Sequence, residues 1–195
     1  MGKRAEQKKE RKRNLLRVSL SLFVKKGFDG TTVRDIASEA RISPGLLFHY
    51  FPTKDDILRE LLIEAQAGFG EMIDLLESES DPLEGFQKVA HRVLLSFTNS
   101  STINTFLLVN QVKTYALLSD NNMVILNTVG MMERSISIIK RGQVSNQFKK
   151  DNPEALALGF WGALQGIAEL LSWHPEYPIP SVQSVVDILR AHDRS

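Results

Sequence analysis

Cysteine is absent from this 195-residue chain, and histidine is scarce. Without cysteine there are no disulfide bonds, thiolate nucleophiles or cysteine-ligated metals. The four histidines, His49, His91, His174 and His192, are scattered, and no two have the H-x-x-x-H or H-E-x-x-H spacing of a metal site. No serine lies in a G-x-S-x-G motif, and no glycine-rich phosphate loop follows a strand pattern. We therefore expect no metal, no cofactor, no catalytic residue and no enzymatic activity.

Long hydrophobic runs are missing as well, although hydrophobic residues make up 43% of the chain. Polar residues interrupt the apolar stretches before they reach the roughly 20 residues that a membrane-spanning helix needs. The N-terminus is charged and lacks the apolar segment of a signal peptide. The sequence therefore predicts a cytoplasmic protein without a membrane partner.

The alternation of polar and apolar residues that marks β-strands is also absent. Apolar residues instead recur at helical steps, as Leu16, Leu20 and Phe23 do. The motifs at 32–35 and 53–56 have the S/T-x-x-D form of a capping box, which begins a helix. We predict an all-α protein of about nine helices. After a first helix that ends at Gly27, the expected ranges are 32–40, 43–51, 53–77, 82–98, 103–118, 122–141, 153–173 and 181–191.

The formal net charge is only +1, but the two signs are unevenly distributed. Residues 1–60 contain 14 Lys and Arg against 8 Asp and Glu, which leaves +6, and the remaining residues carry −5. Residues 3–13 alone hold seven basic and two acidic side chains. We interpret this basic tail as an arm that follows DNA phosphates. The alternative is a solvated, frayed helix start that only keeps the protein soluble.

Residues 32–51 read as two short helices joined by a tight turn, which is a helix-turn-helix. Its expected core is formed by Ile36, Ala37, Ala40, Ile42, Leu47 and Phe51, and we place Phe48 with them. The rest of the second helix then faces outward, and in such modules that face enters the DNA major groove. The outward residues are Pro44, Gly45, Leu46, His49 and Tyr50.

The chemistry of the outward residues suits DNA. Tyr50 can donate to a phosphate oxygen, and His49 can reach a phosphate or a base edge. Arg34 and Lys54 supply positive charge for phosphates. The full set of predicted DNA-binding residues is Thr32, Arg34, Arg41, Ser43, Pro44, Gly45, Leu46, His49, Tyr50 and Lys54.

At these residues the chain resembles the TetR family of transcriptional regulators. The family pattern is met by Phe23, Gly27-Phe28, Thr31-Thr32, Ile36-Ala37, Ser43, Gly45, Leu47-Phe48, Tyr50-Phe51 and Lys54. The resemblance implies a DNA-binding domain over residues 1–53 and a helical effector-binding and dimerisation domain over 54–195. It further implies a homodimeric repressor that binds a palindromic operator on double-stranded DNA and is released by a small, largely apolar effector.

Two positions depart from the family pattern. Arg41 stands where the turn usually carries glycine, and a positive φ there would cost arginine roughly 1 kcal/mol. Phe48 stands where tyrosine is frequent, so a hydroxyl contact to phosphate is lost. We interpret Phe48 as a core residue or an apolar contact to a thymine methyl.

The helix over 153–173 is apolar nearly all round and carries a stripe of small residues. Such a stripe lets a second helix approach closely, within one subunit or between two. The resemblance favours a dimer interface, formed together with the helix over 181–191 as a four-helix bundle. The residues expected there are Gly159, Gly162, Gly166, Leu170 and Trp173. In the loop before this helix, Asn146 replaces a usual glycine and tolerates left-handed geometry.

The middle helices mix large apolar side chains with a few polar ones, as small-molecule sites do. The ligand-binding candidates are Phe106, Asn110, Tyr115, Met131, Trp161, Gln165 and Glu169. The alternative is that they are ordinary core residues. The rival for the whole chain is a helical ligand-binding or protein-interaction module whose helix-turn-helix no longer reads DNA.

Overall fold

The computed structural model describes residues 2–115 and 130–191, and of 113–115 the backbone alone. These residues form nine helices and an isolated β-bridge, so the all-α prediction is confirmed. The chain divides into two compact units. Unit 1 holds residues up to Ala65 and the part of α6 from Leu107 on; unit 2 holds the chain from Gln66 to Phe106 and the C-terminal helices. The predicted domain boundary at residue 53 remains a prediction.

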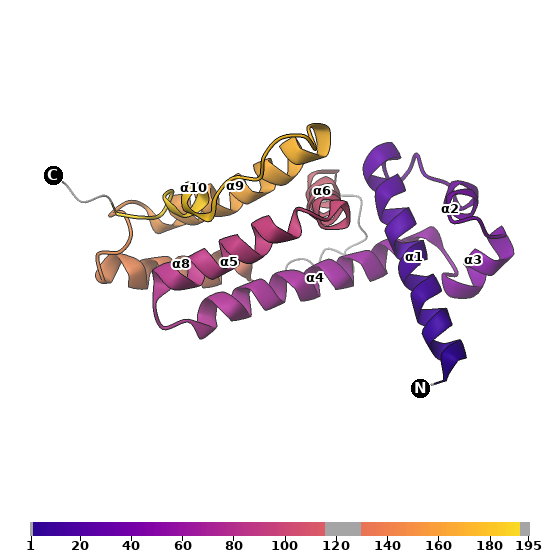
Figure 1. Ribbon diagram of the computed structural model, residues 1–195, viewed down its shortest axis with the longest axis horizontal. Helices are drawn as coiled ribbons and strands as arrows, with labels where there is room; N and C mark the ends of the chain where they lie inside the picture. Colours follow the sequence, from indigo (N-terminus) through magenta and orange to yellow (C-terminus); the bar gives the residue numbers. More distant parts are fainter. Residues whose placement is uncertain (1, 116–129, 192–195) are drawn as a thin grey trace. The chain divides into compact units, whose positions relative to one another are not determined.

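Unit 1 contains three complete helices and parts of two longer ones. They are α1 (Lys3–Lys26), α2 (Val33–Glu39), α3 (Pro44–Tyr50), the start of α4 (Lys54–Ser78) and the end of α6 (Ser100–Tyr115). Figure 1 shows α2 and α3 as two short helices joined by a tight turn beside α1. α1 is capped by Gly27, the stop that the sequence predicted, and the φ of 77° at this residue suits glycine.

The core of unit 1 comes from residues at helical spacing on each helix. Leu15 and Phe23 of α1 are fully buried, as are Ile36 of α2 and Leu58 of α4. Phe23 packs edge-on against Phe28, with ring centroids 5.1 Å apart. This core holds α2 and α3 against α1 and α4, so the outward face of α3 is supported from behind.

Unit 2 is a bundle around helix α5. Its helices are the rest of α4, α5 (Pro82–Ser96), the start of α6, α8 (Met131–Val144), α9 (Pro153–Trp173) and α10 (Val182–Val186). In Figure 1, α5 runs between α4 and the pair formed by α9 and α10. The Phe86 ring is fully buried and meets the rings of Phe148 and Phe160 at centroid distances of 5.6 and 4.8 Å.

Side-chain caps explain where several helices begin. Asp81 accepts from the amide of Glu84 at the start of α5. Asn152 accepts from two amides at the start of α9, with Pro153 as the first helical residue. The predicted range 153–173 matches α9 to the residue. The first part of the predicted helix over 122–141 lies outside the described residues.

The last helix is shorter than predicted. α10 ends at Val186, whereas the sequence predicted helix as far as residue 191. After it the backbone turns and pairs with the loop before α9: the amide of Lys149 donates to Leu189 O at 2.8 Å, and that of Ala191 to Gln147 O at 2.8 Å. These bonds replace helical ones, and periodicity alone does not reveal them.

The expectation that no apolar stretch is long enough to span a membrane is wrong for helix α9. By length and composition alone, one helix among the described residues could cross a membrane, and it is α9. Leu156, Phe160 and Leu164 on one of its faces are nonetheless buried within unit 2. We therefore describe α9 as a core helix of this bundle.

Candidate nucleic-acid interface

The start of α2 is fixed by a reciprocal cap between Thr32 and Asp35. The amide of Asp35 donates to Thr32 Oγ1 at 3.1 Å, and the amide of Thr32 donates to Asp35 Oδ2 at 2.8 Å. The hydroxyl of Thr32 and the ammonium of Lys26 also donate to this carboxylate and, with the cap, hold the Asp35 pKa well below its usual range. Thr32, predicted to contact DNA, therefore already has a structural role.

The turn between α2 and α3 depends on a left-handed residue. Arg41 has a φ of 54°, and the amide of the next residue, Ile42, returns to Ala37 O at 2.9 Å. Arg41 therefore has the positive φ that the usual glycine at this position suggests, and Asn146 has left-handed geometry with a φ of 56°. The side chain of Arg41 is exposed at the turn, next to the first residues of α3.

The first turn of α3 presents little side-chain bulk. Ser43 caps the helix by accepting from the amide of Leu46 at 3.2 Å, and Pro44 is the first helical residue. A Cβ placed on Gly45 would meet nothing within 4 Å, so this side of the backbone is open. Another surface can therefore approach the backbone of α3 closely here.

The two faces of α3 are clearly separated. Leu47 and Phe51 are 1% and 3% exposed and hold the helix against the unit 1 core. Phe48 is 49% exposed, so the interpretation that groups it with the core is wrong. The reason is geometric: Phe48 lies about 100° around the helix from Leu47, on the side of Gly45 and His49.

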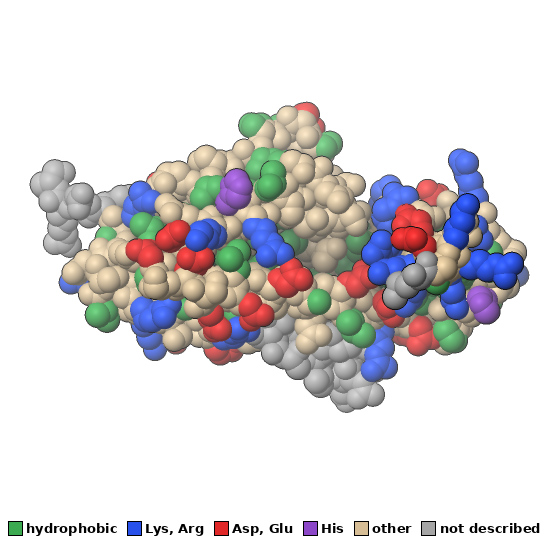
Figure 2. Space-filling model, turned by 60° about the horizontal axis from the view of Figure 1, so that its bottom comes forward, with side chains coloured by type: hydrophobic (Ala, Val, Ile, Leu, Met, Phe, Trp, Pro, Cys, Tyr) green, Lys and Arg blue, Asp and Glu red, His purple; other side chains and the backbone are tan. Residues whose placement is uncertain are grey.

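The remaining outward residues lie on accessible parts of the same unit. His49 is exposed and Tyr50 half-buried, and their rings meet edge-on at 5.8 Å. Arg34 is exposed on α2, and Leu46 is half-buried on α3. On the face drawn in Figure 2, Lys and Arg side chains are crowded over the N-terminal helices, with carboxylates among them.

Lys54 has an unexpected environment. Its ammonium donates to Phe28 O at 2.6 Å and to Thr31 O at 3.0 Å, and it lies 4.2 Å from the centroid of the Phe28 ring. Lys54 therefore joins the first turn of α4 to the loop before α2. Its charge suggested a phosphate contact. The carbonyl partners lie 23 and 26 residues away in the sequence, so a local sequence pattern does not predict them.

The basic tail is helical. α1 begins at Lys3, so residues 3–13 form its first three turns. Lys12 has its partners within unit 1: its ammonium pairs with Glu60 at 2.5 Å and lies 5.5 Å from the Phe51 ring centroid. The other basic residues of this segment are exposed.

The residues predicted for dimerisation lie along α9. A Cβ on Gly159 would come within 3.0 Å of Ile188 Cγ2, so this glycine packs within its own chain. Gly162 and Gly166 have nothing within 4 Å of such a Cβ. Leu170 and Trp173 are 52% and 66% exposed. The last four residues thus form an open strip with two large apolar side chains.

The ligand-binding candidates fall into separate groups. Phe106 is buried in unit 2 with the rings of Phe69 and Phe97, whereas Asn110 is exposed on the unit 1 part of α6. Trp161 donates to Ser135 Oγ at 3.0 Å, and Ser135 donates to Met131 O at 2.6 Å. Gln165 and Glu169 lie half-buried on α9, and the side chain of Tyr115 lies outside the described residues.

The turn at Arg41, the capped short helices and the outward face of α3 together define a helix-turn-helix protein. Residues 15–61 match the model of "Bacterial regulatory proteins, tetR family". The transcriptional repressor KstR2 of Mycobacterium tuberculosis is 36% identical over 92 residues. That stretch covers 45% of this chain and 44% of the repressor, which is less than two thirds of its length.

The whole described fold has counterparts among solved structures. The structure of the ketosteroid transcriptional regulator KstR2 of Mycobacterium tuberculosis gives a TM-score of 0.77 at 20% identity, over 93% of this chain and 96% of that one. AibR, solved in complex with isovaleryl coenzyme A and operator DNA, gives 0.72 at 17% identity, over 91% and 94%. At such identities the likeness shows the fold alone. The match over residues 15–61 shows that this part of the chain belongs to the TetR family.

Proposed function

We propose that this chain is a ligand-responsive transcriptional repressor that binds a palindromic DNA operator as a homodimer. The observation that carries the proposal is the first turn of α3, where Gly45 leaves the backbone open beside exposed Ser43 and Pro44. An α-helix with such a bare N-terminal end can insert into a major groove and place its amides and small side chains against base edges. Such a regulator works where the DNA is, in the cytoplasm.

The open strip of α9 supports the homodimer. Gly162 and Gly166 leave room for a second helix to approach, and the exposed Leu170 and Trp173 supply apolar surface for it to bury. A two-fold axis would bring the same strip of a second copy against this one. Two helix-turn-helix units related by this axis would read two half-sites about one helical turn apart, roughly 34–36 Å.

The environment of α8 and α9 supports an effector that is largely apolar with a polar end. The Nε2 atom of Gln165 is buried and has no hydrogen-bond partner among the described residues. It lies one helical turn from Trp161, on a helix that is otherwise apolar at this level. A ligand oxygen would accept from this amide. Isovaleryl coenzyme A, with which AibR was solved, carries a short apolar acyl group next to a thioester oxygen, and this end of the molecule would probe the site.

The experiment that tests the proposal is an anisotropy titration of the full chain. The probes are a labelled duplex from the region upstream of its own gene and a scrambled duplex of equal length. We expect tighter binding to the first, and affinity for both that falls steeply with salt. Equal, salt-independent or absent binding to both duplexes would favour the protein-interaction module instead.

A further inference from the structure

Helix α4 carries two glycines, Gly68 and Gly70, in the middle of its 25 residues. We propose that residues 66–72 form a hinge segment, so that α4 behaves as two rigid helical parts and not as one rigid rod. The segment begins where α4 passes from unit 1, which ends at Ala65 in this helix, into unit 2, which begins at Gln66. A bend here lets each part of α4 change direction while both units stay folded.

Packing within the chain does not require either glycine. A Cβ placed on Gly68 or on Gly70 would meet nothing within 4 Å, so no close approach of another described residue excludes a side chain there. The two positions also do not form one groove, because residues two apart point about 200° away from each other around a helix. Glycine weakens a helix interior because its backbone has more freedom to lose. What both glycines contribute to α4 is therefore a backbone that bends at low cost, and small-residue pairs are a recognised cause of helix bends.

The core contacts of α4 are interrupted over the same segment. Leu58 and Leu62 are fully buried before it, and Ile73 and Leu76 are fully buried after it. The structure describes all of the residues 66–72, and none of them is buried. Two turns of a helix that packs on a core normally include apolar positions buried against it. The hinge segment is thus the part of α4 that core packing holds least.

Polar contacts fix the two flanking parts of α4, each within its own unit. In unit 1, the ammonium of Lys12 pairs with Glu60 at 2.5 Å. In unit 2, the guanidinium of Arg134 on α8 pairs with Asp74 and with Glu77, both at 2.7 Å. Since both parts are held from outside the helix, a change in the direction of α4 is concentrated in the segment between them.

A ring contact lies at the centre of the hinge segment. Phe69 meets Phe106 of α6 edge-on, with centroids 5.4 Å apart, and Phe106 meets Phe97 in the same way at 5.2 Å. Phe106 is the last residue of α6 in unit 2, and the unit 1 part of this helix starts at Leu107. Both α4 and α6 therefore pass from one unit to the other within a few residues of this contact. We infer that the Phe69–Phe106 pair is the pivot of the hinge.

The test uses the absence of cysteine, which allows spin labels to be attached only where cysteines are introduced. Ser38→Cys in unit 1 and His91→Cys in unit 2 replace exposed residues. Double electron–electron resonance then measures the distances between the two labels in the full chain. Labelled protein is diluted with unlabelled protein, so that only distances within one copy are recorded. We expect a broad distribution with both glycines present and a distinctly narrower one after Gly68→Ala/Gly70→Ala.

Gly162→Ala/Gly166→Ala is the matched control. It makes the same change at two glycines of α9 that also have open space around a Cβ, and it should leave the label distances unchanged. Equal narrowing in both double variants would overturn the hinge. A distribution that keeps its width after Gly68→Ala/Gly70→Ala would overturn it as well, and would mean that these glycines only leave room for another molecule.

Hydrogen exchange gives a second and local measurement. Gly68→Ala/Gly70→Ala should slow exchange of the amides of residues 68–74 by about fivefold to thirtyfold and leave those of 57–62 unchanged. Ala67→Gly adds a third glycine at an exposed position of the hinge segment, so it should speed this exchange and broaden the label distances. Equal slowing along the whole of α4 would mean a general gain in helix stability and would contradict a local hinge.

Both measurements use the free protein, so the hinge is tested separately from the proposed function. A chain that binds no DNA but shows the expected narrowing would refute the proposed function and support the hinge. A chain that binds the upstream duplex and shows no narrowing would do the reverse.

Discussion

The ammonium of Lys54 lies 2.6 Å from the carbonyl oxygen of Phe28 and 4.2 Å from the centroid of the same residue's ring. This pair joins the first turn of α4 to the loop that leads into α2. The first turn of α4 is thereby tied to the loop that supports the helix-turn-helix. Lys54 thus has a role in the free protein before any phosphate is bound.

Lys54→Met tests how this role divides between support and DNA contact. Methionine keeps the apolar stem over the Phe28 ring and removes two charged hydrogen bonds, so we expect a loss of about 1.5–3 kcal/mol in the free energy of unfolding. Denaturation of the full chain measures it. DNA affinity should fall for specific and random duplexes alike. A salt slope lower by about one would assign Lys54 a phosphate as well; unchanged stability would contradict the supporting role.

Phe48 should matter for binding and not for folding. Because its ring is 49% exposed, Phe48→Ala is expected to change the free energy of unfolding by less than about 0.5 kcal/mol. Leu47→Ala, one residue earlier and fully buried, should cost about 2–5 kcal/mol. Affinity for the upstream duplex should drop for Phe48→Ala in a sample that is still folded. Phe48→Tyr should bind at least as tightly as wild type.

Arg41→Gly separates backbone strain from charge. The φ of 54° favours glycine by roughly 1 kcal/mol, partly offset by the greater freedom of glycine in the unfolded chain. Stability should therefore be unchanged or slightly higher. If the exposed guanidinium reaches a phosphate, the salt slope falls by about 0.9. Arg41→Asn, which also tolerates this geometry, is the control. A clear loss of stability in both variants would mean that the arginine side chain itself supports the turn.

Gly162 and Gly159 form a matched pair for the proposed dimer. Gly162→Leu places a side chain into open space within the chain, so each copy should fold while the dimer dissociates. Gly159→Leu would instead strike Ile188 of its own chain and lower thermal stability. Sedimentation and thermal unfolding distinguish the two effects. A wild type that sediments as a monomer would refute the interface.

The cap at Asp35 predicts a pH dependence. Its folded-state pKa lies below the ordinary value of about 4, so the ionised carboxylate stabilises the folded state above that pH. The contribution is lost as the pH falls through 4 toward the lower pKa. Wild type should therefore exceed Asp35→Asn in stability at pH 7, and the difference should shrink below about pH 4. Hydrogen exchange of the α2 amides measures this locally, with Asp55→Asn as the control.

Local chemistry made much of the fold predictable. Capping boxes, the glycine after α1 and Pro153 at the start of α9 act over three or four residues, so they are readable without tertiary contacts. The positive φ of Arg41 was suggested only by the resemblance, in which this turn usually carries glycine. The candidate site on α3 followed from the same periodicity.

What the sequence did not predict has two causes, local helix geometry at Phe48 and contacts between distant residues elsewhere. Phe48 was placed with the core because four rings follow one another, and only the packing of Leu47 and Phe51 shows which rings face inward. α10 is shorter than predicted because the residues that follow it form backbone hydrogen bonds with the loop before α9. Gly159 belongs to the same stripe as Gly162, but Ile188 covers one and not the other.

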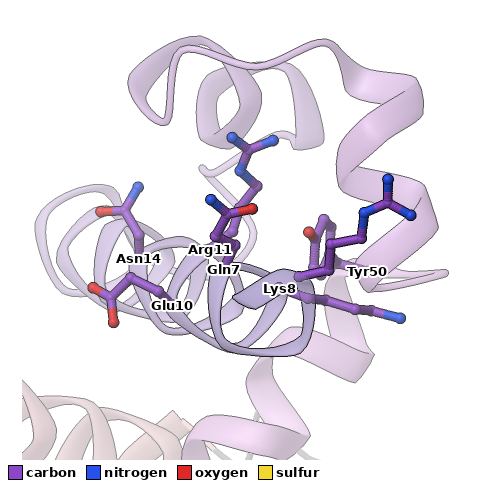
Figure 3. Close-up of a pocket in the computed structure, with 7 residues that line it drawn as sticks. Gln7, Lys8, Glu10, Arg11, Asn14 and Tyr50 are labelled. Atoms are coloured by element: carbon purple, nitrogen blue, oxygen red, sulfur yellow. The ribbon is translucent and has the colours of Figure 1, made fainter. Parts of the chain in front are cut away.

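The sequence by itself determined that the chain is helical, where most helices begin, and that a basic helix-turn-helix unit precedes an acidic remainder with one long apolar helix. These properties depend on periodicity, capping and charge along a few consecutive residues. Only the tertiary structure decided that Lys54 and Lys12 already have partners within unit 1. Arg4, Lys8 and Arg11 instead line a hollow together with Tyr50 (Figure 3) and have no carboxylate within ion-pair distance among the described residues. Which cations are free depends on carbonyls and carboxylates brought close by folding, and no local pattern records those distances.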